Sequence, residues 1–305
     1  MASAVVTVLA AAGGAAVAQA SDGQTVTSLR QIDAESLADA IAGRNIDVLE
    51  ATFTGDDVQA GRFSGLGDTG LARGVALSSG SVIASDPQSP DDVDFTRSAL
   101  LGPNTSLTTT GDLGGEGSAE LDSLFGATNY DAAVLTMEVV PRHSRISLRY
   151  VFGSEEYAGW AARDYTDSFA IWVDGEPCSH VPGTSDLVST GTINETTNSE
   201  EYVANFSGND PTAGGHDTEL NGFTQELTCE ASVTAGEPAT IIVAVADTAD
   251  GQLDSTVLLA RDGLTSSRDK GDGNGHGHKG KGNGNGAEPA SSRGHGHWGW
   301  HPRAV

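Results

Sequence analysis

The sequence predicts an all-β protein, an antiparallel two-sheet sandwich of jelly-roll type, with one short N-terminal helix and a disordered C-terminal tail. Three observations predict this fold class. Runs with apolar residues at every second position, or with consecutive β-branched residues, recur between residues 75 and 260. Segments rich in Gly, Asp, Ser and Thr separate these runs. Helical spacing of apolar residues occurs in one segment, close to the N-terminus.

The predicted elements are one helix followed by strands. The helix lies within residues 29–43, where Ile32, Leu37, Ala38 and Ile41 fall near helical spacing and Gly43 marks the end. The clearest strands are residues 75–84, 133–140, 145–152, 168–173, 240–246 and 255–260. Asp174-Gly175 predicts a turn, and the long polar segments 86–117 and 184–222 are interpreted as functional loops.

The composition changes near both ends of the chain. Residues 4–18 form an apolar stretch followed by Ala18-Gln19-Ala20, which is typical of a signal peptide cut after Ala20. From residue 265 onward the chain is dominated by Gly, with His and Lys interspersed, which is typical of a low-complexity, flexible tail. We therefore expect a signal peptide at residues 1–20, a β-sandwich domain at 29–264 and a disordered tail at 265–305.

The charge of the chain restricts its partners. The formal net charge is −26, and the acidic excess lies almost wholly before residue 268. Such a surface repels nucleic acid and anionic membranes, so no nucleic-acid partner is expected. Apart from residues 4–18, no apolar stretch approaches the roughly 18 residues of a membrane span.

The chain has two cysteines, Cys178 and Cys229. In an exported protein they most simply pair with each other and close a long loop. Neither cysteine lies in a recognisable nucleophile motif, so catalysis by a reactive thiol is not expected.

Acidic residues gather where predicted strands begin or end. Phe152-Gly153-Ser154-Glu155-Glu156-Tyr157 follows one strand, and Asp247, Asp250 and Asp254 lie in the connection between two others. Clustered carboxylates without nearby Lys or Arg repel one another, and a bound divalent cation relieves that repulsion. Calcium accepts six to eight oxygen ligands and fits best. The predicted calcium ligands are Glu155, Glu156, Asp167, Asp247, Asp250 and Asp254.

Two other interpretations of these acids stay open. They are turn-forming and solvated surface residues in an Asp-rich chain, or they are the acid and base of a secreted polysaccharide hydrolase. Adjacent residues on a strand point to opposite faces, so at most one of Glu155 and Glu156 points inward if the strand continues through them. This alternation argues against both glutamates serving one substrate. The chain contains no Gly-x-Ser-x-Gly, His-Glu-x-x-His or nucleotide-binding motif, and no catalytic residue is assigned.

Aromatic residues follow the first acidic segment. Tyr157, Trp160 and Tyr165 could together form a platform for a sugar ring, whereas Trp172 lies in a predicted strand and is expected to pack in the core. A cell-wall or extracellular glycan, or a protein, is therefore the expected ligand.

The acidic segments also carry a family resemblance. The chain resembles the choice-of-anchor L domain, a family of bacterial exported surface proteins, over nearly the whole expected domain. The strongest matches are residues 152–157 and the later Ala246-Asp247, Asp250-Gly251 and Asp254-Ser255. The resemblance implies a β-domain that works outside a bacterial cell, secreted or at the surface, as a binding or adhesion module; an enzymatic activity is not implied.

Overall fold

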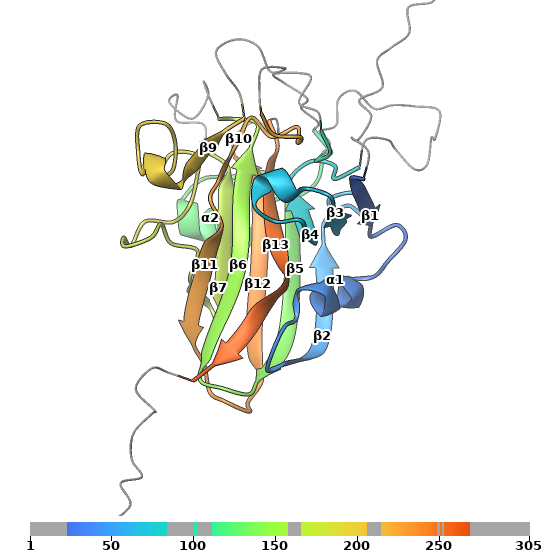
Figure 1. Cartoon of the computed structure of the whole chain (residues 1–305), viewed down its shortest axis with the longest axis vertical. Coiled ribbons are helices and arrows are strands. Elements are labelled where there is room, and N and C mark those ends of the chain that lie inside the picture. The colour runs from blue at the N-terminus through green and yellow to red at the C-terminus, as the bar shows by residue number, and fades with distance from the viewer. Residues whose placement is uncertain are drawn as a thin grey trace, which may run out of the picture. The chain divides into compact units, whose positions relative to one another are not determined.

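Two antiparallel sheets pack face to face as a sandwich, which confirms the predicted fold class (Figure 1). The structure is a computed structural model, and it describes residues 23–83, 100–102, 112–157, 166–205, 215–248, 251 and 253–268. The proposed signal peptide and nearly all of the predicted tail lie outside these residues.

The larger sheet has eight strands. Seven of them follow one another in space as β1 (Thr25–Ser28), β3 (Ala60–Ser64), β4 (Arg73–Ser78), β13 (Ser255–Ser267), β6 (Arg145–Ser154), β10 (Gly222–Thr224) and β9 (Tyr202–Ala204). The eighth strand, β11 (Leu227–Ser232), also pairs with β6. The smaller sheet has five strands in the order β2 (Ile46–Thr54), β5 (Asn129–Pro141), β12 (Ala239–Thr248), β7 (Ser168–Val173) and β8 (Glu176–Pro177).

The main core lies between the sheets because strand residues alternate between the two faces. Tyr150 and Phe152 of β6 face Phe169 of β7, and the Phe152 and Phe169 rings stack with centroids 5.3 Å apart. Residues of opposite parity form two smaller apolar clusters, one on the outer face of each sheet. The strands at the centres of the two sheets, β13 and β12, are therefore apolar on both faces. For β12, the β-branched run at 240–246 predicts this.

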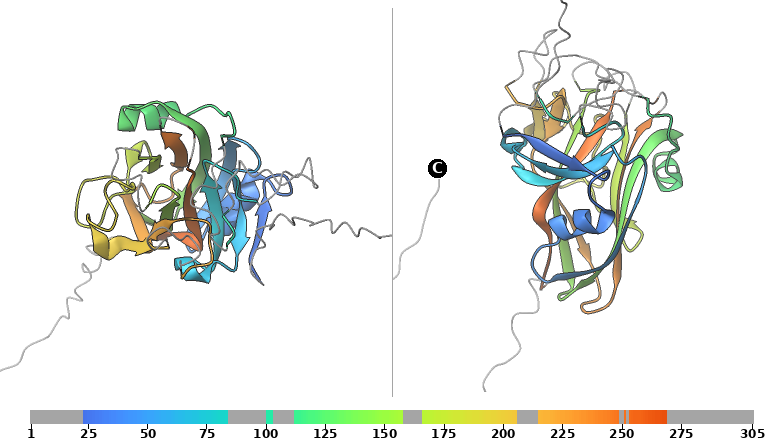
Figure 2. Two further views of the ribbon diagram at one scale, coloured as in Figure 1. Left: turned by 90° about the horizontal axis from the view of Figure 1, so that it is seen from above. Right: turned by 90° about the vertical axis from the view of Figure 1, so that its right-hand side faces the viewer.

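Two short helices cover parts of the sandwich (Figure 2). Helix α1 (Ala34–Ile41) begins at Asp33, whose carboxylate accepts a hydrogen bond from the Ser36 amide at 2.9 Å. It buries Leu37, Ala38 and Ile41 in the main core, as predicted.

The second helix, α2 (Ala119–Phe125), is absent from the sequence-based prediction, which contains strands and turns only after residue 43. Its one fully buried apolar side chain, Leu121, packs on the outer face of the smaller sheet beside Trp172. A helix with so little apolar periodicity is held by tertiary packing, which a periodicity argument does not detect.

The predicted strands match the observed ones to different extents. The strand at 168–173 has the predicted bounds, and the turn at Asp174-Gly175 joins β7 to β8 with positive φ at both residues. Strand β4 ends at Ser78, several residues before the predicted end. Strand β13 continues to Ser267 rather than 260, because an irregularity between Leu259 and Leu264 lets it go on pairing with β6 after it leaves β4.

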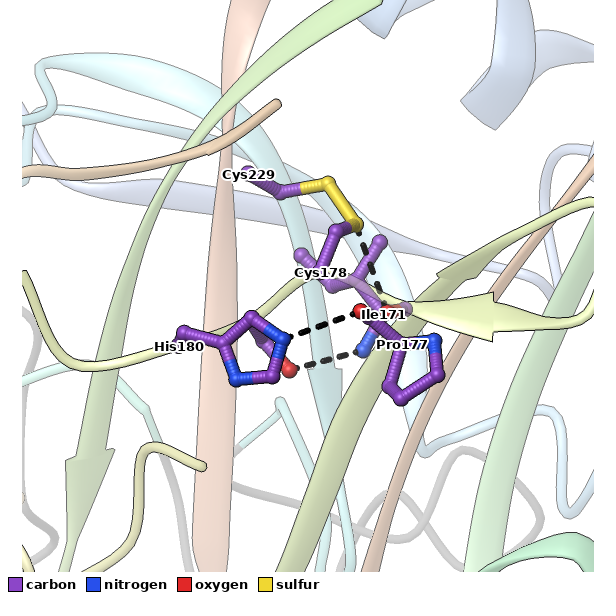
Figure 3. The surroundings of a disulfide bond; sticks show 6 residues. Ile171, Pro177, Cys178, His180 and Cys229 are labelled. Atoms are coloured by element: carbon purple, nitrogen blue, oxygen red, sulfur yellow. Dashed lines mark hydrogen bonds between the residues drawn. A yellow bond between two sulfur atoms is a disulfide. The ribbon is translucent and has the colours of Figure 1, made fainter. Parts of the chain in front are cut away.

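A disulfide joins Cys178 to Cys229, as predicted (Figure 3). Cys178 directly follows β8 of the smaller sheet and Cys229 lies in β11 of the larger one, so the bond links the two layers. The segment is anchored further: the Cys178 amide donates to the Ile171 carbonyl at 2.8 Å, and His180 Nε2 lies 3.1 Å from the Pro177 carbonyl.

Removal of this disulfide should destabilise the domain. The bond closes a loop of 51 residues, for which the chain-entropy argument gives about 4 kcal/mol. We expect the Cys178→Ser, Cys229→Ser double variant to melt about 10 °C lower than the wild type. Thermal unfolding followed by circular dichroism measures this shift. Addition of a reductant is the control: it should lower the wild-type melting temperature similarly and leave that of the double variant unchanged. Equal melting temperatures of wild type and variant would contradict a stabilising role.

Candidate functional site

The predicted acidic residues meet at one end of the sandwich, where four strands begin or end. Ser154, the last residue of β6, pairs with Ser255, the first of β13. On the other sheet, Ala246 of β12 pairs with Ser168, the first residue of β7. The acids beside these positions form the carboxylate cluster, defined as Glu155, Glu156, Asp167, Asp247 and Asp254. Asp250, also predicted to be a ligand, lies outside the described residues.

All five side chains of the carboxylate cluster are buried, with at most 1% of each residue exposed. The alternation argument, which would leave one glutamate in solvent, does not apply because β6 ends at Ser154. The chain turns there: the Glu156 amide donates to Ser154 Oγ at 2.9 Å, and the Glu155 amide donates to the Asp254 carbonyl at 3.0 Å. Both glutamates consequently lie in the interior.

Asp167 is tied to both sheets by hydrogen bonds. Its Oδ1 accepts from the Thr248 amide at 3.1 Å, and its Oδ2 accepts from the Ser255 hydroxyl at 2.7 Å. Its own amide donates to Glu156 Oε2 at 3.3 Å. Asp167 therefore connects the ends of β12, β13 and the segment after β6.

Asp247 is the least satisfied member of the cluster. It is fully buried, and neither carboxylate oxygen has a hydrogen-bond partner with normal geometry. The Ser79 hydroxyl lies close to Asp247, and its hydrogen-bonding interaction offsets part of the rise that burial causes in the pKa of Asp247. A buried carboxylate in this state is costly unless it is protonated or a cation binds it.

Asp254 occupies a space that a glycine leaves open. A Cβ atom at Gly80 would lie 1.7 Å from Asp254 Oδ2, so any side chain at residue 80 would displace the carboxylate. The Ser79-Gly80 turn after β4 thus admits Asp254 into the cluster.

Burial and repulsion from neighbouring carboxylates raise the pKa values of Asp167 and Asp247. Burial is the largest cause for Asp167, followed by the charges of Glu156 and Asp247, and the hydrogen bonds from Ser255 and Thr248 offset only part of the rise. Burial likewise raises the pKa of Asp247 well above its usual value, with Asp131 and both glutamates adding to the effect. No Lys, Arg or His of the described residues is buried.

Asp131 is a neighbour of the carboxylate cluster, because its charge contributes to the raised pKa of Asp247. It is not among the site residues predicted from the sequence. Asp131 lies in β5, where its carboxylate accepts hydrogen bonds from the amides of Leu113 and Gly115. Burial raises its pKa as well. The available signal was an acid just before the apolar run at 133–140, the same pattern that singled out Asp254 before β13.

The donor chemistry of the cluster suits a hard cation, because every side chain supplies carboxylate oxygens. Among the residues that the structure describes, no three His, Cys, Asp or Glu side chains are already arranged to hold one metal ion. Binding would therefore require the carboxylates to reorient. The undescribed residues 249, 250 and 252 interrupt the β12–β13 connection beside them.

The aromatic residues near the cluster pack inward where they are described. Tyr157 is buried against Tyr202, with ring centroids 4.9 Å apart, and Trp172 is buried on the outer face of the smaller sheet, which confirms its predicted packing. Trp160 and Tyr165 lie outside the described residues. Tyr157 thus offers no exposed face to a sugar ring.

Comparison with known proteins gives one match. The family model of the choice-of-anchor L domain matches residues 25–265. The match begins at the first residue of β1 and ends within β13, so it contains the whole carboxylate cluster. No curated protein and no solved structure matches the chain.

The raised pKa values predict a stability that falls as the pH rises. A carboxyl group with a higher pKa in the folded state binds its proton more tightly there. The resulting stabilisation is complete below the unfolded pKa of about 3.9 and is lost as the pH rises through the folded value. In metal-free buffer we therefore expect a higher melting temperature at about pH 5.5 than at about pH 8.

Substitution tests which group causes this dependence. Asp247→Asn cannot ionise, so this variant should lose much of the pH dependence and gain stability at the higher pH. The matched control is Asp57→Asn, which removes the same charge from an exposed position. Calorimetry at both pH values measures the effect. Identical pH profiles for wild type and Asp247→Asn would contradict it.

Proposed function

The chain belongs to the choice-of-anchor L domain family, and we propose that it is an exported binding or adhesion module, secreted or at the cell surface, whose carboxylate cluster binds calcium. The observation that carries the calcium proposal is the fully buried Asp247, whose two carboxylate oxygens have no hydrogen-bond partner with normal geometry and which lies beside four other buried carboxylates.

Export is supported by the covalent chemistry of the chain. The Cys178–Cys229 disulfide is of a kind that forms and persists in oxidising compartments outside the cytosol. The apolar residues 4–18 before Ala18-Gln19-Ala20 fit a cleaved export signal. In the part of the chain that the structure describes, no helix is long and apolar enough to cross a membrane.

Calcium binding is supported by the electrostatics of the cluster. A buried carboxylate without hydrogen-bond donors, such as that of Asp247, is compatible with a stable fold at neutral pH if it holds a proton or binds a cation. Asp247 would be the central ligand because its two oxygens have no hydrogen-bond partner with normal geometry, and Glu155, Glu156, Asp167, Asp254 and the undescribed Asp250 would complete the set. Extracellular calcium is near millimolar, so a site with a Kd of about 10⁻⁴ M would be occupied there.

A secreted polysaccharide hydrolase is the alternative function. The observation in its favour is the raised pKa of Asp167 beside Glu156, because a carboxyl group that holds its proton beside a second carboxyl group is typical of a general acid and its partner. Burial argues the other way, since a polymer would have to reach two side chains that are each at most 1% exposed. We therefore place the binding module first.

Calcium should raise the melting temperature of the protein. Calcium at about 100 times its Kd would stabilise the domain by about 2.7 kcal/mol, which is about 5–10 °C for a domain of this size. Scanning calorimetry in excess chelator, in calcium and in magnesium measures the shift. Magnesium should give a much smaller one because it loses its water ligands reluctantly.

The calcium-dependent shifts of two variants test whether the ion binds at the carboxylate cluster. Asp247→Asn should abolish most of the calcium-dependent shift, whereas the control Asp57→Asn should keep it. No shift in wild type, or an equal shift in Asp247→Asn, would overturn the calcium proposal.

Glu155→Gln distinguishes the binding module from the hydrolase. In a calcium-stabilised module this change should reduce the calcium-dependent rise in melting temperature, and no polysaccharide should be cleaved by either protein. Reducing-end assays on a panel of plant and bacterial polysaccharides provide the measurement. Cleavage by wild type that is lost in a normally folded Glu155→Gln would instead establish the hydrolase.

A further inference from the structure

A second polar site lies away from the carboxylate cluster, between α1 and strands β1, β3, β4 and β13. It is a groove of about 540 Å³. Arg62 of β3, Arg73 of β4 and Arg261 of β13 all line it. The convergence is unusual for this chain, which carries a net charge of −26 and has no lysine before Lys270.

The register of the sheet places two of these arginines on one face. Arg62 pairs directly with Val75, and side chains of directly paired residues lie on the same face. Arg73 lies two residues before Val75 and therefore also shares that face. Val75 belongs to the core between the sheets. The arginines thus continue the inner face of the larger sheet to the place where α1, rather than the smaller sheet, packs over it.

The groove arginines differ from others on the surface in their partners. Arg142, Arg145 and Arg149 each pair with a carboxylate across neighbouring strands. By contrast, Arg62 and Arg73 are exposed and their side chains form no ion pair or hydrogen bond with any described residue. Arg261 lies 3.6 Å from Asp262 in a solvent-exposed contact. Among the described residues, no acceptor occupies the donors of these two guanidinium groups.

The remaining lining is polar and contains both acceptors and hydroxyl groups. Asp39 of α1 and Asp262 of β13 supply carboxylates, and Thr25, Thr27 and Ser64 supply hydroxyls. Guanidinium groups bind carboxylate and sulfate oxygens, often with two parallel hydrogen bonds. Aspartates accept hydrogen bonds from hydroxyl groups but repel a ligand that carries only anionic oxygens. A ligand suited to this groove combines an anionic group with hydroxyl donors.

We infer that the groove binds an acidic saccharide, through Arg62 and Arg73 to its carboxylate or sulfate groups and through Asp39 and Asp262 to its hydroxyls. This inference deepens the proposed function, because it gives the binding module a ligand class and a site, and it rests on export for access to such polymers. The overall negative charge of the protein does not prevent binding: at physiological ionic strength, repulsion beyond about 8 Å is largely screened, whereas direct contacts persist.

Binding to the full chain is measured by calorimetry with four probes: trigalacturonate, sulfated maltotriose, neutral maltotriose and inorganic tripolyphosphate. We expect sub-millimolar binding of trigalacturonate or of sulfated maltotriose, and the probe that binds identifies carboxylate or sulfate as the recognised group. Arg62→Gln and Arg73→Gln should each weaken binding about tenfold. The control Arg268→Gln removes the same charge from an exposed site outside the groove and should bind like the wild type. Both groove positions are exposed, so the variants should keep the wild-type melting temperature.

Four results would overturn the inference. These are no binding of either acidic trisaccharide up to about 10 mM, equal binding of neutral maltotriose, tighter binding of tripolyphosphate, and an equal loss of affinity in Arg268→Gln. Because the readout is saccharide affinity and not calcium-dependent melting, failure here is distinguishable from failure of the calcium proposal.

Discussion

Water is excluded from the space between the two sheets because their inner faces are apolar, and Tyr150 and Phe152 of the larger sheet pack there against Phe169 of the smaller one. The rest of the structure depends on this exclusion. It makes the apolar core stable, and it also determines what happens to any polar group that the strand ends bring into the same space. The disulfide between Cys178 and Cys229 holds the layers together at another point of that core.

In the carboxylate cluster, charged groups lie in this space from which water is excluded. Backbone amides and hydroxyls satisfy Asp167, but Asp247 has no comparable set of donors. Ionisation of Asp247 is therefore unfavourable in this buried position. A proton on Asp247 relieves this cost, as a bound cation would, so the stability of the fold should depend on the pH of the solution.

The groove lined by Arg62, Arg73 and Arg261 also carries charged side chains, but there the charges remain in contact with water. Arg62 and Arg73 continue the inner face of the larger sheet, but they lie where α1 covers it incompletely, so water reaches them. Charges there need no partner to be tolerated, and their donors stay available to a ligand. The two sites differ in their access to solvent: the carboxylates of the cluster are buried, and the arginines of the groove are exposed.

The sequence by itself determined the sandwich, helix α1, the disulfide and the acidic strand ends, because period-two patterns, helical spacing of apolar residues and cysteine pairing are local or compositional signals. Only the tertiary structure decided which charges are buried. Glu155 and Glu156 both enter the interior because β6 stops at Ser154, which alternation along a continuing strand cannot foresee. Asp131, helix α2 and the meeting of Arg62 with Arg73 depend on register and packing between segments far apart in the chain. Desolvation and charge–charge distances are properties of that arrangement, and no local pattern encodes them.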